Sequence, residues 1–241
     1  LSSSRQTGRE TKSLANRGVT VNDILDYTDE PFADSSAINV YILSKETRKH
    51  ATVALSGDGA DELLGGYNKH AAFYRMINKG WKENTTSLLL PLLKNLPQSR
   101  NNKFSNTIRQ LVRFAEGSKL SPPERYWRWA GYADETAVLK LLSPALQGKI
   151  SEEDYQTRKS DFLKFIPENY AMNDIFRTDA GFVLPNDMLT KVDLMSMANG
   201  LEVRAPFLDY QVVNFLFSLP ADYKINGSMR KRILQDSFRD I

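Results

Sequence analysis

The sequence predicts an α/β fold in which a parallel sheet carries a ligand site and most of the remaining chain is helical. An apolar run of strand character, 52–55, opens into a loop rich in glycine and acidic residues, 56–62, with helical patterns on both sides. This α-β-α order favours a parallel sheet that binds ligands at the carboxyl ends of its strands. Residues 73–170 show helical periodicity without a convincing strand.

Composition narrows the possible functions. The 241 residues are 41% hydrophobic and 25% charged, as in ordinary globular proteins, and the net charge of +3 gives no reason to expect a nucleic-acid partner. No apolar run approaches the ~20 residues that span a bilayer, so we expect no membrane partner. The chain has no cysteine, which excludes disulfides and thiolate sites and favours a reducing, cytoplasmic location.

The first part of the chain is organised around the predicted strand. Residues 1–18 are polar and aperiodic and are expected to be a poorly determined lead-in. Residues 19–72 form the predicted α-β-α unit, in which Asp34 or Ser35 caps the helix before the strand and a further helix begins near Asp61.

The later parts are predicted to be helical. Prolines divide residues 73–170 into several helices of modest length. In residues 171–241, a helix that follows Pro185 is expected to end near Gly200. A loop, 201–208, then leads to a helix capped by Asp209, and a last helix is expected from about Met229 towards Phe238.

The loop 56–62 has the composition of a nucleotide and metal site. Its glycines let the backbone approach a ligand, Ser56 offers a hydroxyl group, and Asp58, Asp61 and Glu62 offer the hard oxygen atoms that Mg²⁺ prefers. The loop matches neither a Walker motif nor a dinucleotide fingerprint. The alternative is a tight turn whose acids only complement a helix end.

A second candidate pair lies on the helix after Pro185. Asp187 and Lys191 stand four residues apart, so both project from one helix face. The alternative to a functional role is an ordinary helical ion pair, which is worth about 0.2 to 0.5 kcal/mol.

The order of these segments resembles the synthetase domain of glutamine-dependent asparagine synthetases. The matching blocks are D-E-P-x-x-D-S-S at 29–36, S-G-[DE]-G-x-D-E-x-x-G-G-Y at 56–67, and L-P-x-D-x-x-x-K-x-D-x-x-S-M-x-x-x-L-E-x-R-x-P-F-L-D at 184–209. The resemblance covers about residues 24–238 and is weak in the helical middle. It implies a Rossmann-like sheet of the adenine nucleotide alpha hydrolase type, with a large, mostly helical remainder.

The resemblance also implies a reaction and its residues. ATP and Mg²⁺ would activate aspartate as an aspartyl-adenylate, and ammonia from glutamine would displace AMP, so that AMP and pyrophosphate leave as products. The implied ATP-binding residues are Ser56, Gly57 and Asp61, with Asp61 also on Mg²⁺. The implied catalytic residues are Asp58, beside the activated intermediate, and Asp187 and Lys191, in the amino-acid pocket.

Departures from the family pattern qualify this interpretation. The family's S-G-G-x-D-S loop, its R-x-K-x-G-F type segment and the amino-terminal cysteine of its glutaminase domain are missing from this sequence. We therefore expect an internal part of a longer ligase, inactive by itself, whose parent carries the glutaminase domain. Exposed apolar surface on such a piece would favour association, which leaves a homo-oligomer open. An amidotransferase acting on another carboxylate, such as a cell-surface sugar or a β-lactam precursor, and a non-catalytic relative are the alternatives.

Overall fold

The structure, a computed structural model, describes residues 21–30, 32, 34–78, 90–99, 102–131, 135–227 and 229–240. The predicted lead-in, 1–18, lies outside these residues. At the amino-terminal end of the described chain, α2 (Val21–Leu25) precedes α3 (Ser36–Thr47) and β1 (Val53–Leu55). The predicted helix and strand around 36–55 are therefore confirmed.

A parallel pair of strands joins the two ends of the chain. β1 pairs with β2 (Glu202–Arg204) in the register Val53 to Glu202 and Leu55 to Arg204. The sequence predicted a loop at 201–208, and this prediction was wrong, because β2 gains its hydrogen bonds only from a strand about 150 residues earlier in the chain. The parallel pairing agrees with an α/β fold; the described residues contain only this two-stranded sheet and a short hairpin, so the larger Rossmann-like sheet stays a prediction.

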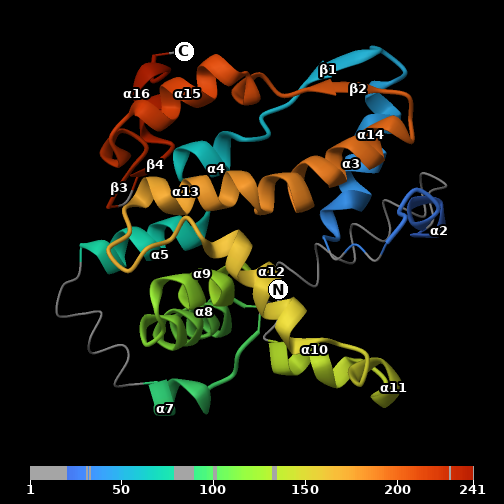
Figure 1. Ribbon diagram of the computed structural model, residues 1–241. Helices are drawn as coiled ribbons and strands as arrows, with labels where there is room; N and C mark the ends of the chain where they lie inside the picture. The colour runs from blue at the N-terminus through green and yellow to red at the C-terminus, as the bar shows by residue number, and fades with distance from the viewer. Residues whose placement is uncertain are drawn as a thin grey trace.

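One nearly continuous helical rod crosses the molecule beneath the sheet (Figure 1). It consists of α13 (Met172–Gly181), a π-helical turn η1 (Leu184–Leu189) and α14 (Thr190–Met197), and α14 packs against α3. Pro185 lies in the π-helical turn, where the hydroxyl group of Thr190 donates a hydrogen bond to the Pro185 carbonyl oxygen (2.7 Å). Because proline has no N–H to continue an α-helix, a local change of helical geometry is expected here, and such turns often occur at functional sites.

The turn after β1 leads into two helices that pack on the rod. These are α4 (Ala60–Leu64) and α5 (Asn68–Ile77), and α13 contacts both of them. α4 begins after Gly59, whose φ of 88° favours glycine, and Leu63 and Leu64 on α4 are almost completely buried.

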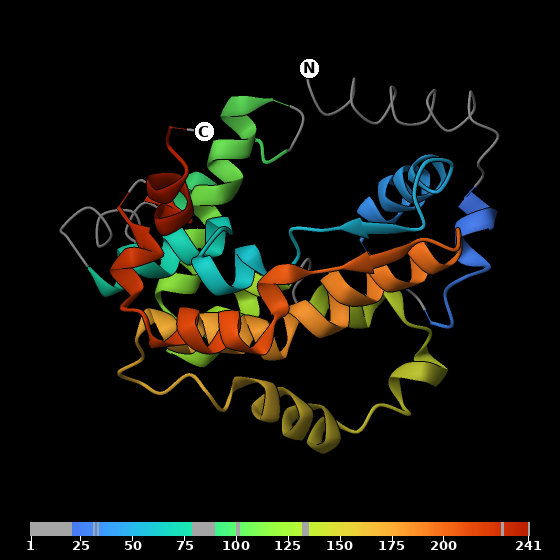
Figure 2. The same cartoon turned by 90° about the horizontal axis from the view of Figure 1, so that it is seen from above.

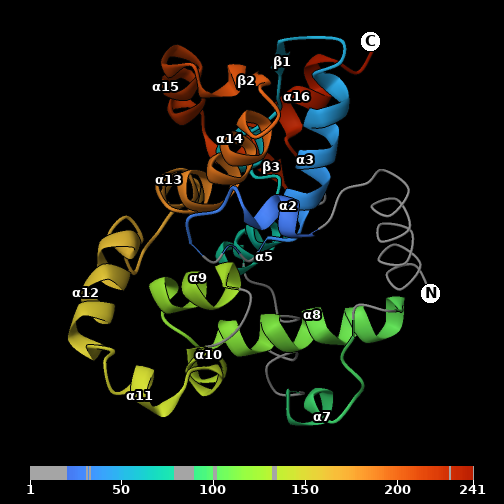
Figure 3. The same ribbon diagram turned by 90° about the vertical axis from the view of Figure 1, so that its right-hand side faces the viewer.

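The middle of the chain forms a separate set of helices beside the rod (Figure 3). Its helices are α7 (Leu90–Lys94), α8 (Lys103–Ser118), α9 (Pro122–Ala130), α10 (Glu135–Leu141), α11 (Pro144–Gln147) and α12 (Glu152–Leu163). The main core joins this set to the rod and α5 through buried Phe73, Tyr126, Trp129 and Phe176. Among the described residues, no helix is both long and apolar enough to cross a membrane.

The carboxyl-terminal segment folds back over α4 (Figure 2). It contains η2 (Pro206–Leu208), α15 (Tyr210–Ser218), η3 (Ala221–Tyr223), a hairpin of β3 (Ile225–Asn226) and β4 (Met229–Arg230), and α16 (Arg232–Ser237). Asp209 caps α15 through its side chain, as predicted. The last helix begins at Arg232 rather than near Met229, because Met229 and Arg230 pair with β3.

Candidate active site

The turn after β1 is closed by its own side chains. The backbone N–H of Ser56 donates to the Arg204 carbonyl oxygen (2.8 Å), which continues the β1 to β2 pairing. The Ser56 hydroxyl group donates to Asp58, and the Asp58 backbone N–H donates to Ser56 Oγ (3.2 Å). This contact places a hydroxyl group and a carboxylate, both predicted from the sequence, side by side at the carboxyl end of the strand.

The glycines of this region differ in the space around them. A Cβ atom added to Gly57 would meet nothing within 4 Å, so the backbone there faces open space. A Cβ atom at Gly59 would lie 2.3 Å from Leu208 Cδ2, and one at Gly66 would lie 1.6 Å from Asp61 Oδ1. Gly59 is favoured by its positive φ, a Cβ atom at Gly66 would displace the Asp61 side chain, and at Gly57 there is room for a ligand.

Asp61 projects from the first turn of α4 and pairs with a lysine from the end of the chain. Lys231 Nζ lies 2.8 Å from Asp61 Oδ1, and both side chains are about one-third exposed. The described residues contain no cluster of three or more acidic, histidine or cysteine side chains that could hold a metal. A single carboxylate still fits Mg²⁺, because this ion is commonly bound by one or two carboxylates together with substrate phosphates and water.

Lys191 pairs with Asp34 rather than with Asp187. Its Nζ lies 2.6 Å from Asp34 Oδ2, and both side chains are largely buried. Asp34 also accepts hydrogen bonds from the Ser36 N–H (2.9 Å) and hydroxyl group (2.7 Å). Burial by itself would raise the pKa of Asp34, but the hydrogen bonds from Lys191 and Ser36 outweigh it, so the pKa is lowered and the carboxylate stays ionised at neutral pH.

Asp187 is left with an unsatisfied oxygen atom. Its Oδ1 is buried and has no hydrogen-bond partner among the residues that the structure describes. Burial raises the pKa of Asp187 and the neighbouring Asp34 raises it further, whereas Lys191 and Lys69 act in the opposite direction. Because buried polar atoms in proteins are almost always paired, this oxygen atom is an exception of the kind that occurs at functional sites.

A buried polar cluster is formed by residues of α4, α5 and α13. Asp179, on α13, is completely buried and lies 2.6 Å from Lys69 Nζ and 2.5 Å from His70 Nε2. Glu62, on α4, accepts a hydrogen bond from the Tyr67 hydroxyl group (2.6 Å). Burial raises the pKa of Glu62, and the suggestion that this carboxylate holds Mg²⁺ stays a prediction.

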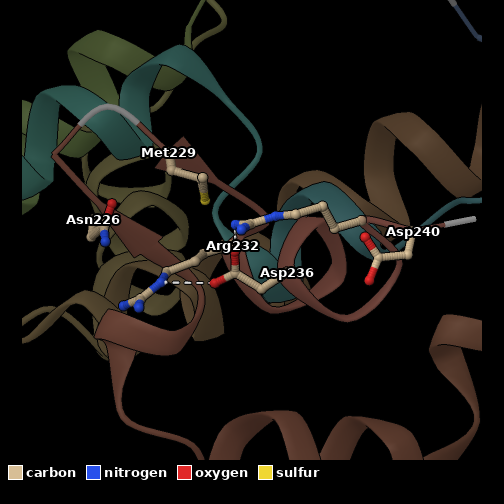
Figure 4. A pocket seen from close by; sticks show the side chains of 6 residues that line it. Asn226, Met229, Arg232, Asp236 and Asp240 are labelled. Carbon is tan, nitrogen blue, oxygen red and sulfur yellow. Dashed lines mark hydrogen bonds and ion pairs between the residues drawn. The ribbon is translucent and has the colours of Figure 1, made fainter.

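A groove near the carboxyl-terminal end lies away from these residues. An open groove of about 570 Å³ at the carboxyl-terminal end is lined by Asn226, Met229, Arg232, Asp236, Arg239 and Asp240 (Figure 4). None of the predicted site residues lines it. Asp236 pairs with Arg232 (3.2 Å) and with Arg239 (2.8 Å), so the charges in this groove compensate one another.

Comparison with known proteins assigns the chain to a family. The model of the asparagine synthase family matches residues 10–241, which includes every predicted site residue. The chain belongs to the asparagine synthase family. It is 31% identical over 221 residues to asparagine synthetase [glutamine-hydrolyzing] 1 of Bacillus subtilis, a match that covers 88% of this chain and 32% of the relative.

Other relatives carry similar names. A putative asparagine synthetase [glutamine-hydrolyzing] of Mycobacterium bovis is 29% identical over 228 residues, covering 91% of this chain and 32% of that protein. A putative asparagine synthetase of Methanocaldococcus jannaschii is 54% identical over 48 residues, covering 20% of this chain and 9% of that protein. No solved structure matches the chain. The chain thus spans about a third of the length of the two longer-matching relatives.

Within this asparagine synthase chain, several site residues escaped the sequence analysis. Asp34 was predicted only as a helix cap, and Lys69, Asp179 and Lys231 received no role. The signals were weak: Lys69 lies two residues after the second asparagine synthase block, and Lys231 lies in an Arg-Lys-Arg run. Their importance depends on partners far away in the sequence, which no local pattern contains.

Proposed function

We propose that this chain forms the ATP-binding and acceptor-binding part of a carbon–nitrogen ligase that makes asparagine from aspartate. One observation carries the proposal beyond family membership. The ion pair between Asp34 and Lys191 joins the first and the third asparagine synthase block, with the unpaired Oδ1 atom of Asp187 close to both charges. Residues from separated blocks therefore gather in one charged site, as a reaction on a charged acid requires.

The reaction would proceed in two steps. A side-chain carboxylate oxygen of aspartate attacks the α-phosphorus of ATP, the bond from that phosphorus to pyrophosphate breaks, and an aspartyl-adenylate forms. Ammonia released from glutamine then attacks the acyl carbon, the bond from that carbon to the AMP oxygen breaks, and a proton is lost to give the amide. In this scheme Ser56 and the open backbone at Gly57 contact the AMP part, and Asp58 lies beside the acyl group.

Asp61 would hold Mg²⁺ at the pyrophosphate end of the nucleotide. Its carboxylate is partly exposed and, among the described residues, pairs with one cation, Lys231, which leaves oxygen lone pairs for the ion. Bound there, Mg²⁺ would neutralise negative charge on the departing pyrophosphate.

Asp187 and Lys191 would hold the acceptor acid. The bare Oδ1 atom of Asp187 is suited to accept a hydrogen bond from the ammonium group of aspartate, since a buried carboxylate oxygen and a cationic donor satisfy one another. Lys191, fixed by Asp34, supplies a positive charge that would favour the acceptor's carboxylates.

The test measures aspartate-dependent formation of AMP and pyrophosphate from ATP, with glutamine or ammonia, in the intact protein that carries this chain. Asp187→Asn is expected to raise the KM for aspartate at least tenfold, and Asp161→Asn, at an exposed position of α12, is the matched control. If AMP forms with a different carboxylic acid but not with aspartate, the acceptor is that acid rather than aspartate. Absence of AMP formation with every acid would indicate a non-catalytic relative.

A further inference from the structure

The β3–β4 hairpin is fastened to the turn between α4 and α5 (Figure 1). Arg230, on β4, donates two hydrogen bonds from Nη1, one to the Gly66 carbonyl oxygen (2.9 Å) and one to Asn68 Oδ1 (2.8 Å). The backbone N–H of the next residue, Lys231, donates to the Leu64 carbonyl oxygen (3.1 Å). Two neighbouring residues of the hairpin therefore hold the same short turn, one through its side chain and one through its backbone.

The glycines of this turn lie directly against the hairpin. A Cβ atom added to Gly65 would lie 3.3 Å from Ile225 Cβ, and one added to Gly66 would lie 2.5 Å from Lys231 Cε. Ile225 is completely buried and pairs with Arg230 across the hairpin. Because the turn and the hairpin are so closely apposed, a shift of the hairpin would move Lys231 relative to α4.

This contact decides where the Lys231 side chain begins. Lys231 Nζ lies 2.8 Å from Asp61 Oδ1, but both side chains are about one-third exposed. An exposed ion pair contributes little free energy, so this pair is not expected to hold the hairpin by itself. A hydrogen bond from a charged donor to a partly buried carbonyl oxygen, such as the one from Arg230 to Gly66, contributes more.

We propose that Arg230 is a positioning residue of the candidate nucleotide site: by binding Gly66 and Asn68, it holds the β3–β4 hairpin on the turn after α4 and so keeps Lys231 beside Asp61. The inference rests on the proposed function, in which Asp61 lies at the pyrophosphate end of the nucleotide. It assigns a role to two residues outside the three asparagine synthase blocks, because Asn68 directly follows the second block and Arg230 lies after the third.

The first test needs no substrate. Hydrogen exchange of the Lys231 backbone amide is followed by NMR in the intact protein after ¹⁵N labelling of lysine, because the bond of this amide to Leu64 reports whether the hairpin stays on the turn. In Arg230→Met this amide is expected to exchange about tenfold faster, as the loss of hydrogen bonds from a charged donor implies. Arg230→Lys keeps a cationic nitrogen that can donate to both acceptors and is expected to restore part of the protection. Arg239→Met removes an exposed arginine that pairs with Asp236 and serves as the matched control.

The second test measures the effect on the nucleotide. In the formation of AMP by the intact protein, Arg230→Met is expected to raise the KM for ATP several-fold and to leave the KM for aspartate unchanged, since the proposed acceptor residues Asp187 and Lys191 lie on another segment. An arginine that only stabilises the fold would lower the melting temperature and leave the ratio of the two KM values unchanged.

A milder variant keeps the proposal testable if Arg230→Met does not fold. Asn68→Ala removes one acceptor, leaves Arg230 in place, and is expected to speed exchange of the Lys231 amide by less than Arg230→Met does. Unchanged exchange of this amide in the folded variants, or an unchanged KM for ATP, would overturn the proposal. A protein that forms no AMP at all would contradict the proposed function, whereas the exchange rates would still decide whether Arg230 holds Lys231 in place.

Discussion

Lys191 and Asp34 are 157 residues apart in the sequence, yet Lys191 Nζ lies 2.6 Å from Asp34 Oδ2. This pair joins the segment just before α3 to the start of α14, and both of its charges act on the neighbouring Asp187. Asp187 and Lys191 lie four residues apart on the same helical rod, but the ion pair of Lys191 is with Asp34, which only the tertiary structure brings close.

Removing one member of this pair should destabilise the protein. Asp34→Asn is expected to lower the free energy of unfolding at pH 7 by about 1 to 3 kcal/mol, because Lys191 then keeps a largely buried charge without a carboxylate. Urea denaturation of the two single variants and of Asp34→Asn with Lys191→Met measures this. The double variant should lose less than the sum of the two single losses, and additive losses would contradict a direct interaction.

The same pair should make the free energy of unfolding depend on pH in the acid range. The pKa of Asp34 is lower in the folded protein than its ordinary value of 3.8, so the pair contributes stability above that value. This contribution is lost as the pH falls below 3.8 through the folded-state pKa. A plot of unfolding free energy against pH should therefore fall less steeply in this acid range for Asp34→Asn than for the unchanged protein.

Two glycines, one in the candidate nucleotide turn and one just after α4, provide a matched comparison. Gly66→Ala should displace the Asp61 side chain and weaken its pair with Lys231, because the new Cβ atom would lie 1.6 Å from Asp61 Oδ1 and 2.5 Å from Lys231 Cε. The expected loss in free energy of unfolding is up to about 1 kcal/mol. Gly57→Ala should change the unfolding free energy by no more than about 0.5 kcal/mol, since nothing lies within 4 Å of its Cβ position. Under the proposed function, Gly57→Ala should nevertheless weaken ATP binding measured by calorimetry. If the ATP affinity is unchanged, the nucleotide does not bind beside Gly57.

Lys231 has a backbone conformation that suits glycine. It is the only non-glycine residue among those described with a positive φ, at 52°. Lys231→Gly and Lys231→Ala both remove the contact with Asp61, but Lys231→Gly should be more stable by about 1 kcal/mol, because glycine adopts this conformation without steric cost. Thermal unfolding of the two variants compares them directly, and equal melting temperatures would argue against strain at this position.

Lys224 should make the free energy of unfolding higher in alkaline solution than at neutral pH. The side chain is completely buried, donates a hydrogen bond to Asn173 Oδ1 (2.8 Å), and lies near the rings of Phe176 and Phe217. Burial lowers the pKa of Lys224 from 10.5 to about 8. The folded protein therefore releases the Lys224 proton at lower pH than the unfolded chain does, and the free energy of unfolding should rise between about pH 8 and pH 10.5.

The control for this prediction is Lys224→Met, which keeps the length of the side chain and removes the charge. Its unfolding free energy should not show the rise between pH 8 and pH 10.5. A rise of the same size in Lys224→Met would assign the effect to another group.

Local signals predicted much of the helical structure and of the candidate site. The strand before Ser56, the helix end near Gly200 and the cap at Asp209 follow from turn and capping chemistry between neighbours in the sequence. The hairpin that delays the last helix to Arg232 was not predicted, since its two-residue strands are too short to show an alternating pattern.

The sequence by itself determined the chemistry of the turn after β1, the Asp187 and Lys191 helix face, and the blocks that mark the asparagine synthase family. Only the tertiary structure decided that residues 202–204 form a strand, that Lys191 pairs with Asp34, and that Lys69 is held by Asp179. The physical reason is the range of each interaction. Caps and turns are made by residues a few positions apart, whereas strand pairing and buried ion pairs acquire their partners only when distant segments pack together and exclude water.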